Sequence, residues 1–166
     1  MPSPRPIQIS TYIFSDIIAS VIVWTAISLQ RKLQLNEEPQ TLTGLFTQDN
    51  YFPLSLILTV IFWLGLYSIM GAYSNSVYKR SRLTDFNSSL IQASSGAIIL
   101  LFVLFMNDSE RNYSYFYITF FSLLLLQAVV TSIGRLIIIT IAKQQLAAGK
   151  FSFKTIIIGN NRKAFD

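Results

Sequence analysis

The sequence contains neither cysteine nor histidine among its 166 residues. Without cysteine the chain can form neither a disulfide nor a thiolate metal site. Without histidine it lacks the usual general base at neutral pH and the commonest metal ligand. Charged residues are also scarce, at 13% of the chain, which is about half the share that soluble domains usually carry. These shortages exclude most familiar acid–base and metal chemistry and argue against a soluble domain.

Hydrophobic residues, in contrast, make up 52% of the chain and gather in four long stretches. The stretches cover residues 12–30, 53–73, 86–106 and 115–142. Each has about the 20 residues that a helix needs to cross a bilayer core, and in hydrocarbon only a helix satisfies its own backbone. Buried helices of a soluble bundle are the alternative, but these would show polar faces at a 3.6-residue period. We therefore predict an all-α membrane protein, with a four-transmembrane-helix bundle over residues 12–148 and an N-terminal tail over 1–11.

The distribution of Lys and Arg predicts the orientation of the bundle. Nine of these residues lie in the two terminal tails and the loop between the second and third stretches, and three lie in the other two loops. The positive-inside rule then places both termini in the cytoplasm. Arg80 and Arg82 become topology residues that contact anionic headgroups, and nucleic acid is not an expected partner. Tyrosines near the cytoplasmic end of the second stretch are expected in an aromatic belt: Tyr67, Tyr73 and Tyr78.

Two charged residues within the apolar stretches are candidates for a role inside the membrane. Asp16 lies near the start of the first stretch, where the helix macrodipole and interfacial water can stabilise a carboxylate. We favour that structural role, with an ion pair to Arg135 as the alternative. Arg135 lies towards the end of the fourth stretch, so we expect it to emerge at the cytoplasmic headgroups.

Small residues follow one face of the third stretch, with Ser89, Ala93 and Ala97 at four-residue spacing and Gly96 beside them. Such a row lets a neighbouring helix approach closely. We interpret it as a packing seam, and it is one reason to expect a homo-oligomer.

The C-terminal residues 149–166 have a different pattern. The β-branched run Thr155–Ile158 meets Gly159 and then turns polar, as the first strand and phosphate loop of a Rossmann-like domain do. Gly159, Asn161 and Ala164 are the weak candidates for a cofactor-binding loop, because Asn161 replaces the middle glycine that would admit a pyrophosphate. We expect an incomplete Rossmann-like domain here, with negligible nucleotide binding by this loop alone.

Carboxylates suited to catalysis are also missing from the predicted cytoplasmic side. The closest acidic pairs are Glu37 with Glu38, and Asp108 with Glu110, and both are predicted to be extracytoplasmic. Asp85 follows Thr84 before the third stretch, where an acid in the first helical turn has an ordinary structural role. We therefore assign no catalytic and no metal-binding residue to the chain.

Several segments resemble the bacterial polyprenyl-phosphate sugar-1-phosphate transferases, in the large form that makes exopolysaccharide or O-antigen. The segment FWLGLYSIMGAYSNSVYKRSRLTDF, residues 62–86, carries much of the resemblance. The rest lies in Gly134–Ile137, in Gly149–Phe151 and in Phe153–Gly159.

The resemblance implies a multi-pass protein of the bacterial inner membrane in which four helices precede a Rossmann-like domain and a catalytic domain. That catalytic domain would move a sugar phosphate from a nucleotide diphosphate sugar to polyprenyl phosphate, with an Asp–Glu pair and Mg²⁺. None of those positions exists in this sequence, so the chain resembles the membrane-anchoring N-terminal part of such an enzyme. Membrane-bound nucleotide-sugar dehydratases or epimerases, and a non-enzymatic four-helix scaffold, remain as alternatives.

Overall fold

A computed structural model describes residues 8–38, 41–74, 76–107 and 113–149. The order of the elements is α1 (Ile9–Leu35), α2 (Leu42–Thr47), α3 (Phe52–Ile69), the 3₁₀ turn η1 (Val77–Lys79), α4 (Arg82–Asn107) and α5 (Tyr113–Ala147). The described part of the chain contains no strand. The predicted strand and glycine loop, with Gly159, Asn161 and Ala164, lie outside the described residues.

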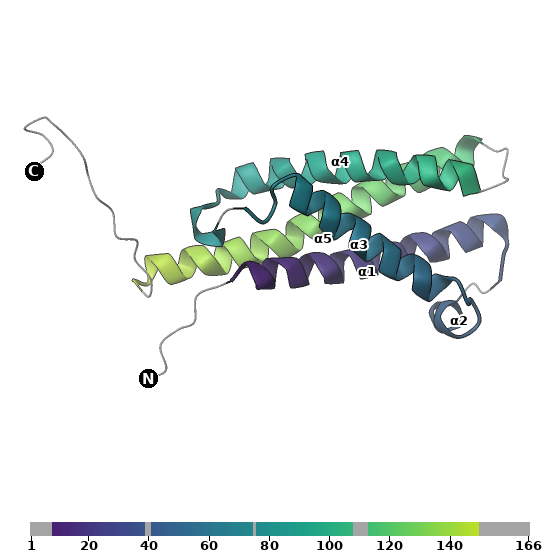
Figure 1. Ribbon diagram of the computed structural model, residues 1–166, viewed down its shortest axis with the longest axis horizontal. Coiled ribbons are helices and arrows are strands. Elements are labelled where there is room, and N and C mark those ends of the chain that lie inside the picture. The colour runs from purple at the N-terminus through teal and green to yellow at the C-terminus, as the bar shows by residue number, and fades with distance from the viewer. Residues whose placement is uncertain (1–7, 39–40, 75, 108–112, 150–166) are drawn as a thin grey trace, which may run out of the picture.

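The four long helices match the four predicted stretches and are long and apolar enough to cross a membrane. The predicted all-α fold is confirmed for the described residues, and the four helices fit a multi-pass membrane protein. Successive long helices run in alternating directions, so the start of α1 and the end of α5 lie at one end of the bundle (Figure 1). We call this the terminal end, and the end with α2 the distal end.

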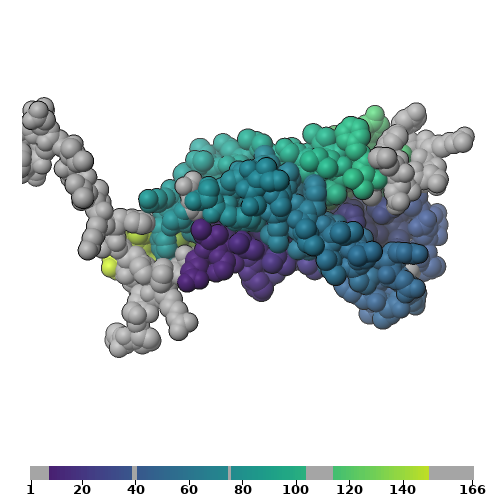
Figure 2. Space-filling model, viewed as in Figure 1, coloured from purple at the N-terminus to yellow at the C-terminus, as the bar shows by residue number. Residues whose placement is uncertain are grey.

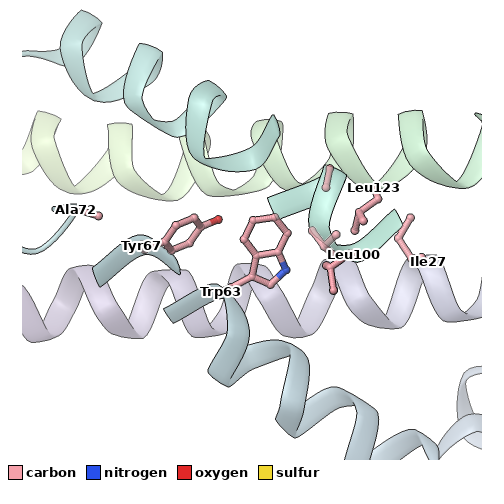
Figure 3. Packing of buried hydrophobic residues seen from close by; sticks show 8 residues of the cluster. Ile27, Trp63, Tyr67, Ala72, Leu100 and Leu123 are labelled. Atoms are coloured by element: carbon pink, nitrogen blue, oxygen red, sulfur yellow. The ribbon is translucent and has the colours of Figure 1, made fainter. Parts of the chain in front are cut away.

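Helix α1 packs against both α5 and α3, and α4 packs mainly against α5. Figure 2 shows α3 lying obliquely across one face of the molecule, between α4 and α1. A cluster of apolar side chains fills the centre of the bundle, and Figure 3 shows Trp63 and Tyr67 of α3 there, near Ile27, Leu100 and Leu123.

The helix ends differ from the predicted ones for local reasons. Helix α1 continues to Leu35 and stops where Asn36 adopts a left-handed conformation, with φ of 53°. Helix α3 ends at Ile69 and not at residue 73, because Gly71 turns the chain with φ of 75°. Helix α5 continues beyond residue 142 to Ala147, before Gly149 at φ of 65°. At 1.5 Å per residue its 35 residues span about 50 Å, longer than a hydrocarbon core of about 30 Å.

The outer surface of the bundle is apolar and its interior is partly polar. Large hydrophobic side chains on every long helix are more than half exposed, among them Phe14, Ile61, Phe102 and Ile133. Buried polar side chains occupy the inside, including Asp16, Gln92, Gln127 and Arg135. Polar groups that face the interior of an apolar bundle are typical of membrane proteins.

The small-residue row of α4 packs within the same chain. Ser89, Ala93 and Ala97 are at most 1% exposed, and a Cβ at Gly96 would overlap the ring of Trp63 from α3. The seam therefore lets α4 approach the chain's own helices, and it does not offer a free surface for a second copy.

Candidate functional site

The most polar part of the interior is an ion pair between α1 and α5. Arg135 donates from Nε to Asp16 Oδ1 at 3.0 Å and from Nη2 to Asp16 Oδ2 at 2.8 Å. Both side chains have an exposed fraction of 0%. A two-point guanidinium–carboxylate pair is the strongest geometry that these groups can adopt, so it joins the first and last long helices.

Helix α4 completes the surroundings of the guanidinium. Arg135 Nη1 donates to Ser89 Oγ at 3.0 Å and to Gln92 Oε1 at 2.8 Å. Ser89 and Gln92 are three residues apart, which places them on one face of a helix. Each of the three guanidinium nitrogens therefore has an acceptor, as a buried charge requires.

Aromatic rings lie close to the same guanidinium. Its central carbon is 4.6 Å from the centroid of the Tyr67 ring and 5.3 Å from that of the Tyr12 ring. Both distances are within the range of cation–π attraction. Helices α1, α3 and α4 thus each contribute a side chain that contacts Arg135 of α5.

A hydrogen-bonded chain leads from Tyr67 deeper into the bundle. Gln127 Nε2 donates to the Tyr67 hydroxyl at 2.8 Å and to Thr131 Oγ1 at 3.2 Å. The Gln127 Oε1 and Ser132 Oγ atoms are buried and have no hydrogen-bond partner among the described residues. This chain extends the polar interior but adds no group that titrates near neutral pH.

A second ion pair closes the terminal end. Arg80 Nη1 donates to Asp85 Oδ1 at 2.8 Å, and the Tyr12 hydroxyl donates to Asp85 Oδ2 at 2.5 Å. Arg80 Nη2 donates to the carbonyl of Ala72. The loop from α3 to α4 is thereby attached to the first turns of α1 and α4.

Tyr73 connects this loop to the central ion pair. Its hydroxyl donates to Asp16 Oδ2 at 2.8 Å. Burial, followed by the neighbouring Asp16 carboxylate, raises the pKa of Tyr73 above its ordinary value. The hydroxyl therefore stays protonated at neutral pH and remains a donor.

The structure changes several expectations about these residues. Asp16 was expected to face interfacial water, with an ion pair to Arg135 as the alternative. The structure shows the ion pair, and the Asp16 side chain is buried. Arg135 is enclosed by the bundle, so the expectation that it reaches the headgroups is wrong. Tyr67 and Tyr78 are buried and hydrogen-bonded to α5 residues and not placed in a belt. Arg80 is mostly enclosed, whereas Arg82 is exposed at the start of α4.

Sequence reasoning missed several members of the network, namely Tyr12, Tyr67, Gln92 and Gln127. A signal for two of them was present, because Gln92 and Gln127 interrupt apolar stretches in the same way as Asp16 and Arg135 do. An amide side chain inside a membrane bundle requires hydrogen-bond partners, so the two glutamines could have been predicted to face the interior of the bundle. The tyrosines carried no comparable signal, since a tyrosine near a helix end equally suits an interface.

The chemistry open to this network is limited. Each buried carboxylate accepts hydrogen bonds from an arginine and a tyrosine. Among the described residues no group of three or more His, Cys, Asp or Glu side chains could hold a metal ion. The arrangement therefore provides a structural clamp with specific geometry.

We compared the chain with models of protein families, with curated proteins and with solved structures. None of the three comparisons finds a match.

Proposed function

We propose that this chain is the membrane-anchoring part of a polyprenyl-phosphate sugar-1-phosphate transferase and is not itself catalytic. The observation that carries the proposal is the mutual pairing of its buried charges. Asp16 with Arg135 joins α1 to α5, and Asp85 with Arg80 joins α4 to the loop that precedes it. A clamp of this kind suits a rigid anchor, because a reacting group would need to reach a substrate.

The arrangement of the bundle supports the same proposal. The start of α1 and the end of α5 lie at one end (Figure 1). Lys79, Arg80 and Arg82 lie in the loop and helix start at that end, where positive residues favour the cytoplasm. The bundle would then present its C-terminal residues to the side where nucleotide sugars occur. The resemblance of residues 62–86, 134–137, 149–151 and 153–159 to the transferase family selects this class of enzyme from the alternatives.

The coding sequence that follows codon 166 and an activity assay test the proposal together. We expect a further apolar hairpin followed by an Asp–Glu pair, and transfer of a sugar phosphate to polyprenyl phosphate by membranes that contain the whole product. Membranes with residues 1–166 alone should be inactive. A serine- or tyrosine-x-x-x-lysine signature would instead indicate a dehydratase or epimerase. A stop codon at that point would favour the scaffold, and either result would overturn the proposal.

A further inference from the structure

A polar cavity lies at the terminal end of the bundle, where the loop from α3 meets α4. Its volume is about 450 Å³, and its lining includes Lys79, Arg80, Ser81, Thr84, Asp85 and Ser88. Pockets of roughly 300–1,000 Å³ accommodate small ligands or headgroups. Neither the ion-pair clamp nor the proposed anchoring role assigns a purpose to this cavity.

The charge of the lining is positive. Lys79 and Arg80 contribute two cations, and Asp85 contributes the one carboxylate. Both oxygens of Asp85 already accept hydrogen bonds, one from Arg80 and one from the Tyr12 hydroxyl. An anion in the cavity would therefore meet a carboxylate that is neutralised, and a net positive field.

Donors remain available around the cavity. Ser81, Thr84 and Ser88 supply hydroxyl groups. An oxyanion is the ligand that matches cations and hydroxyl donors together.

The start of α4 strengthens this preference. Ser81 precedes the helix, and Thr84, Asp85 and Ser88 follow at the spacing of one helical face. The first backbone N–H groups of a helix have no intrahelical acceptor, and the macrodipole favours an anion there. The cavity therefore combines a helix start with two cations and three hydroxyls.

The position of the cavity indicates the source of the anion. Helix α4 begins beside it and is one of the helices that can cross a membrane, so the cavity lies where a spanning helix ends. Headgroups occupy that level of a bilayer. We propose that the cavity binds the phosphate of an anionic lipid headgroup, with a preference for a phosphate monoester that offers three oxygens. The proposal depends on the described residues alone and stands apart from the transferase assignment.

Fluorescence anisotropy tests the proposal by measuring how tightly phosphatidic acid, with a fluorophore on one acyl chain, binds to the protein purified in detergent. Phosphatidylglycerol with the same labelled chain is the matched lipid, because its phosphate is a diester. The variant Lys79→Gln with Ser81→Ala removes a cation and a hydroxyl from the lining. Arg82→Gln is the control variant, because Arg82 is exposed in the same helical turn and does not line the cavity. Thermal unfolding of each variant shows whether it is folded.

We expect phosphatidic acid to bind more tightly than phosphatidylglycerol. The lining variant should weaken binding by about tenfold, as loss of a charged hydrogen bond implies. Arg82→Gln removes only a diffuse attraction between an exposed cation and the headgroups, so it should weaken binding by much less. An equal loss in both variants would show diffuse surface attraction and overturn the proposal, as would equal affinity for the two lipids. Inorganic phosphate is the third probe. If the two lipids bind with equal affinity while inorganic phosphate binds to the wild type and not to the lining variant, the lipid assignment is wrong, and the ligand is a soluble anion.

Discussion

The guanidinium of Arg135 meets the carboxylate of Asp16 through two hydrogen bonds of 3.0 and 2.8 Å, across 119 positions of sequence. Neither side chain is exposed. The pair fixes the relative rotation and the axial register of α1 and α5, because a two-point contact forms in one orientation only. It also brings Ser89 and Gln92 of α4 to the same guanidinium.

Removing both members of this pair should destabilise the bundle by less than the sum of the two single losses. Asp16→Asn leaves a buried guanidinium without its counterion, and Arg135→Gln leaves a buried carboxylate. Each should cost about 3–5 kcal/mol of unfolding free energy, whereas the double variant should cost less than the sum. Unfolding in detergent, followed by circular dichroism, measures the three values. Arg82→Gln is the control, since Arg82 is exposed. Strictly additive losses would contradict the pairing.

Lysine at position 135 should not preserve the stability that Arg135 provides. The guanidinium donates to Asp16 from two nitrogens and to Ser89 and Gln92 from the third. An ammonium keeps the charge but cannot reproduce this planar set of donors. We expect Arg135→Lys to lose about 2 kcal/mol or more, with a buried acceptor left unsatisfied. The same unfolding assay measures it, and stability equal to that of the wild type would show that charge alone is required.

Two glycines of the spanning helices should respond differently to alanine. A Cβ at Gly96 of α4 would overlap the Trp63 ring, whereas a Cβ at Gly65 of α3 would meet nothing within 4 Å. Gly96→Ala should cost about 1–3 kcal/mol through overpacking. Gly65→Ala should cost nothing, because alanine is the better helix former. Pairing Gly96→Ala with Trp63→Phe should recover part of the loss, and equal behaviour of the two glycine variants would refute the predicted contact.

The pair between Lys32 and Asp49 at the distal end should give a pH-dependent contribution to stability. Lys32 Nζ is 2.8 Å from Asp49 Oδ2, and this hydrogen bond lowers the pKa of the Asp49 carboxyl below its ordinary 3.8. Because the folded pKa is the lower one, the contribution is present above pH 3.8 and is lost as the pH falls through the folded value. Asp49→Asn should cost up to about 1 kcal/mol at pH 7.

At a pH below the pKa of Asp49 in the folded protein, the difference in unfolding free energy between Asp49→Asn and the wild type should disappear. Asp49→Ala provides the comparison, because Asp49 Oδ1 also accepts from the backbone N–H of Tyr51 and Phe52 at the start of α3. Asparagine keeps this acceptor and alanine does not, so alanine should cost about 1 kcal/mol more. Unfolding free energies measured from pH 7 to well below pH 3.8 test both effects. A gap between Asp49→Asn and the wild type that widens on acidification would contradict the sign.

Cysteine labelling tests the predicted orientation without removing native thiols, because the sequence has none. Ser74 is exposed at the terminal end and Glu37 at the distal end. We expect a membrane-impermeant maleimide added to intact cells to label Glu37→Cys and to spare Ser74→Cys until the membrane is opened. The reverse pattern would place the terminal end outside, and labelling of both would contradict a spanning bundle.

The four long helices could be predicted because a long apolar stretch in lipid can satisfy its backbone hydrogen bonds only as a helix. Their ends were less predictable, since Asn36 and Gly71 end α1 and α3 through backbone conformation and not through hydropathy. Helix α2 was not predicted, because its six residues are too few to show a helical period.

The polar interior was harder to predict than the helices. The pairing of Asp16 with Arg135 could be named only as an alternative, because their contact depends on how α1 and α5 are rotated about their axes. Evenly apolar helices carry little information about rotation, because apolar side chains face both lipid and core. Tyr12 donates a hydrogen bond to Asp85, and Tyr73 donates one to Asp16. Tertiary packing brings these groups together, and no local sequence pattern specifies it.

Helix α5 is held by polar contacts at two points along its length. Arg135 fixes its middle to Asp16, and Gln145 near its end accepts a hydrogen bond from Tyr78 in the short η1 turn. A displacement of the η1 turn would therefore also move the C-terminal end of α5. The placement of the last turn of α5 therefore depends on the same loop that borders the cavity.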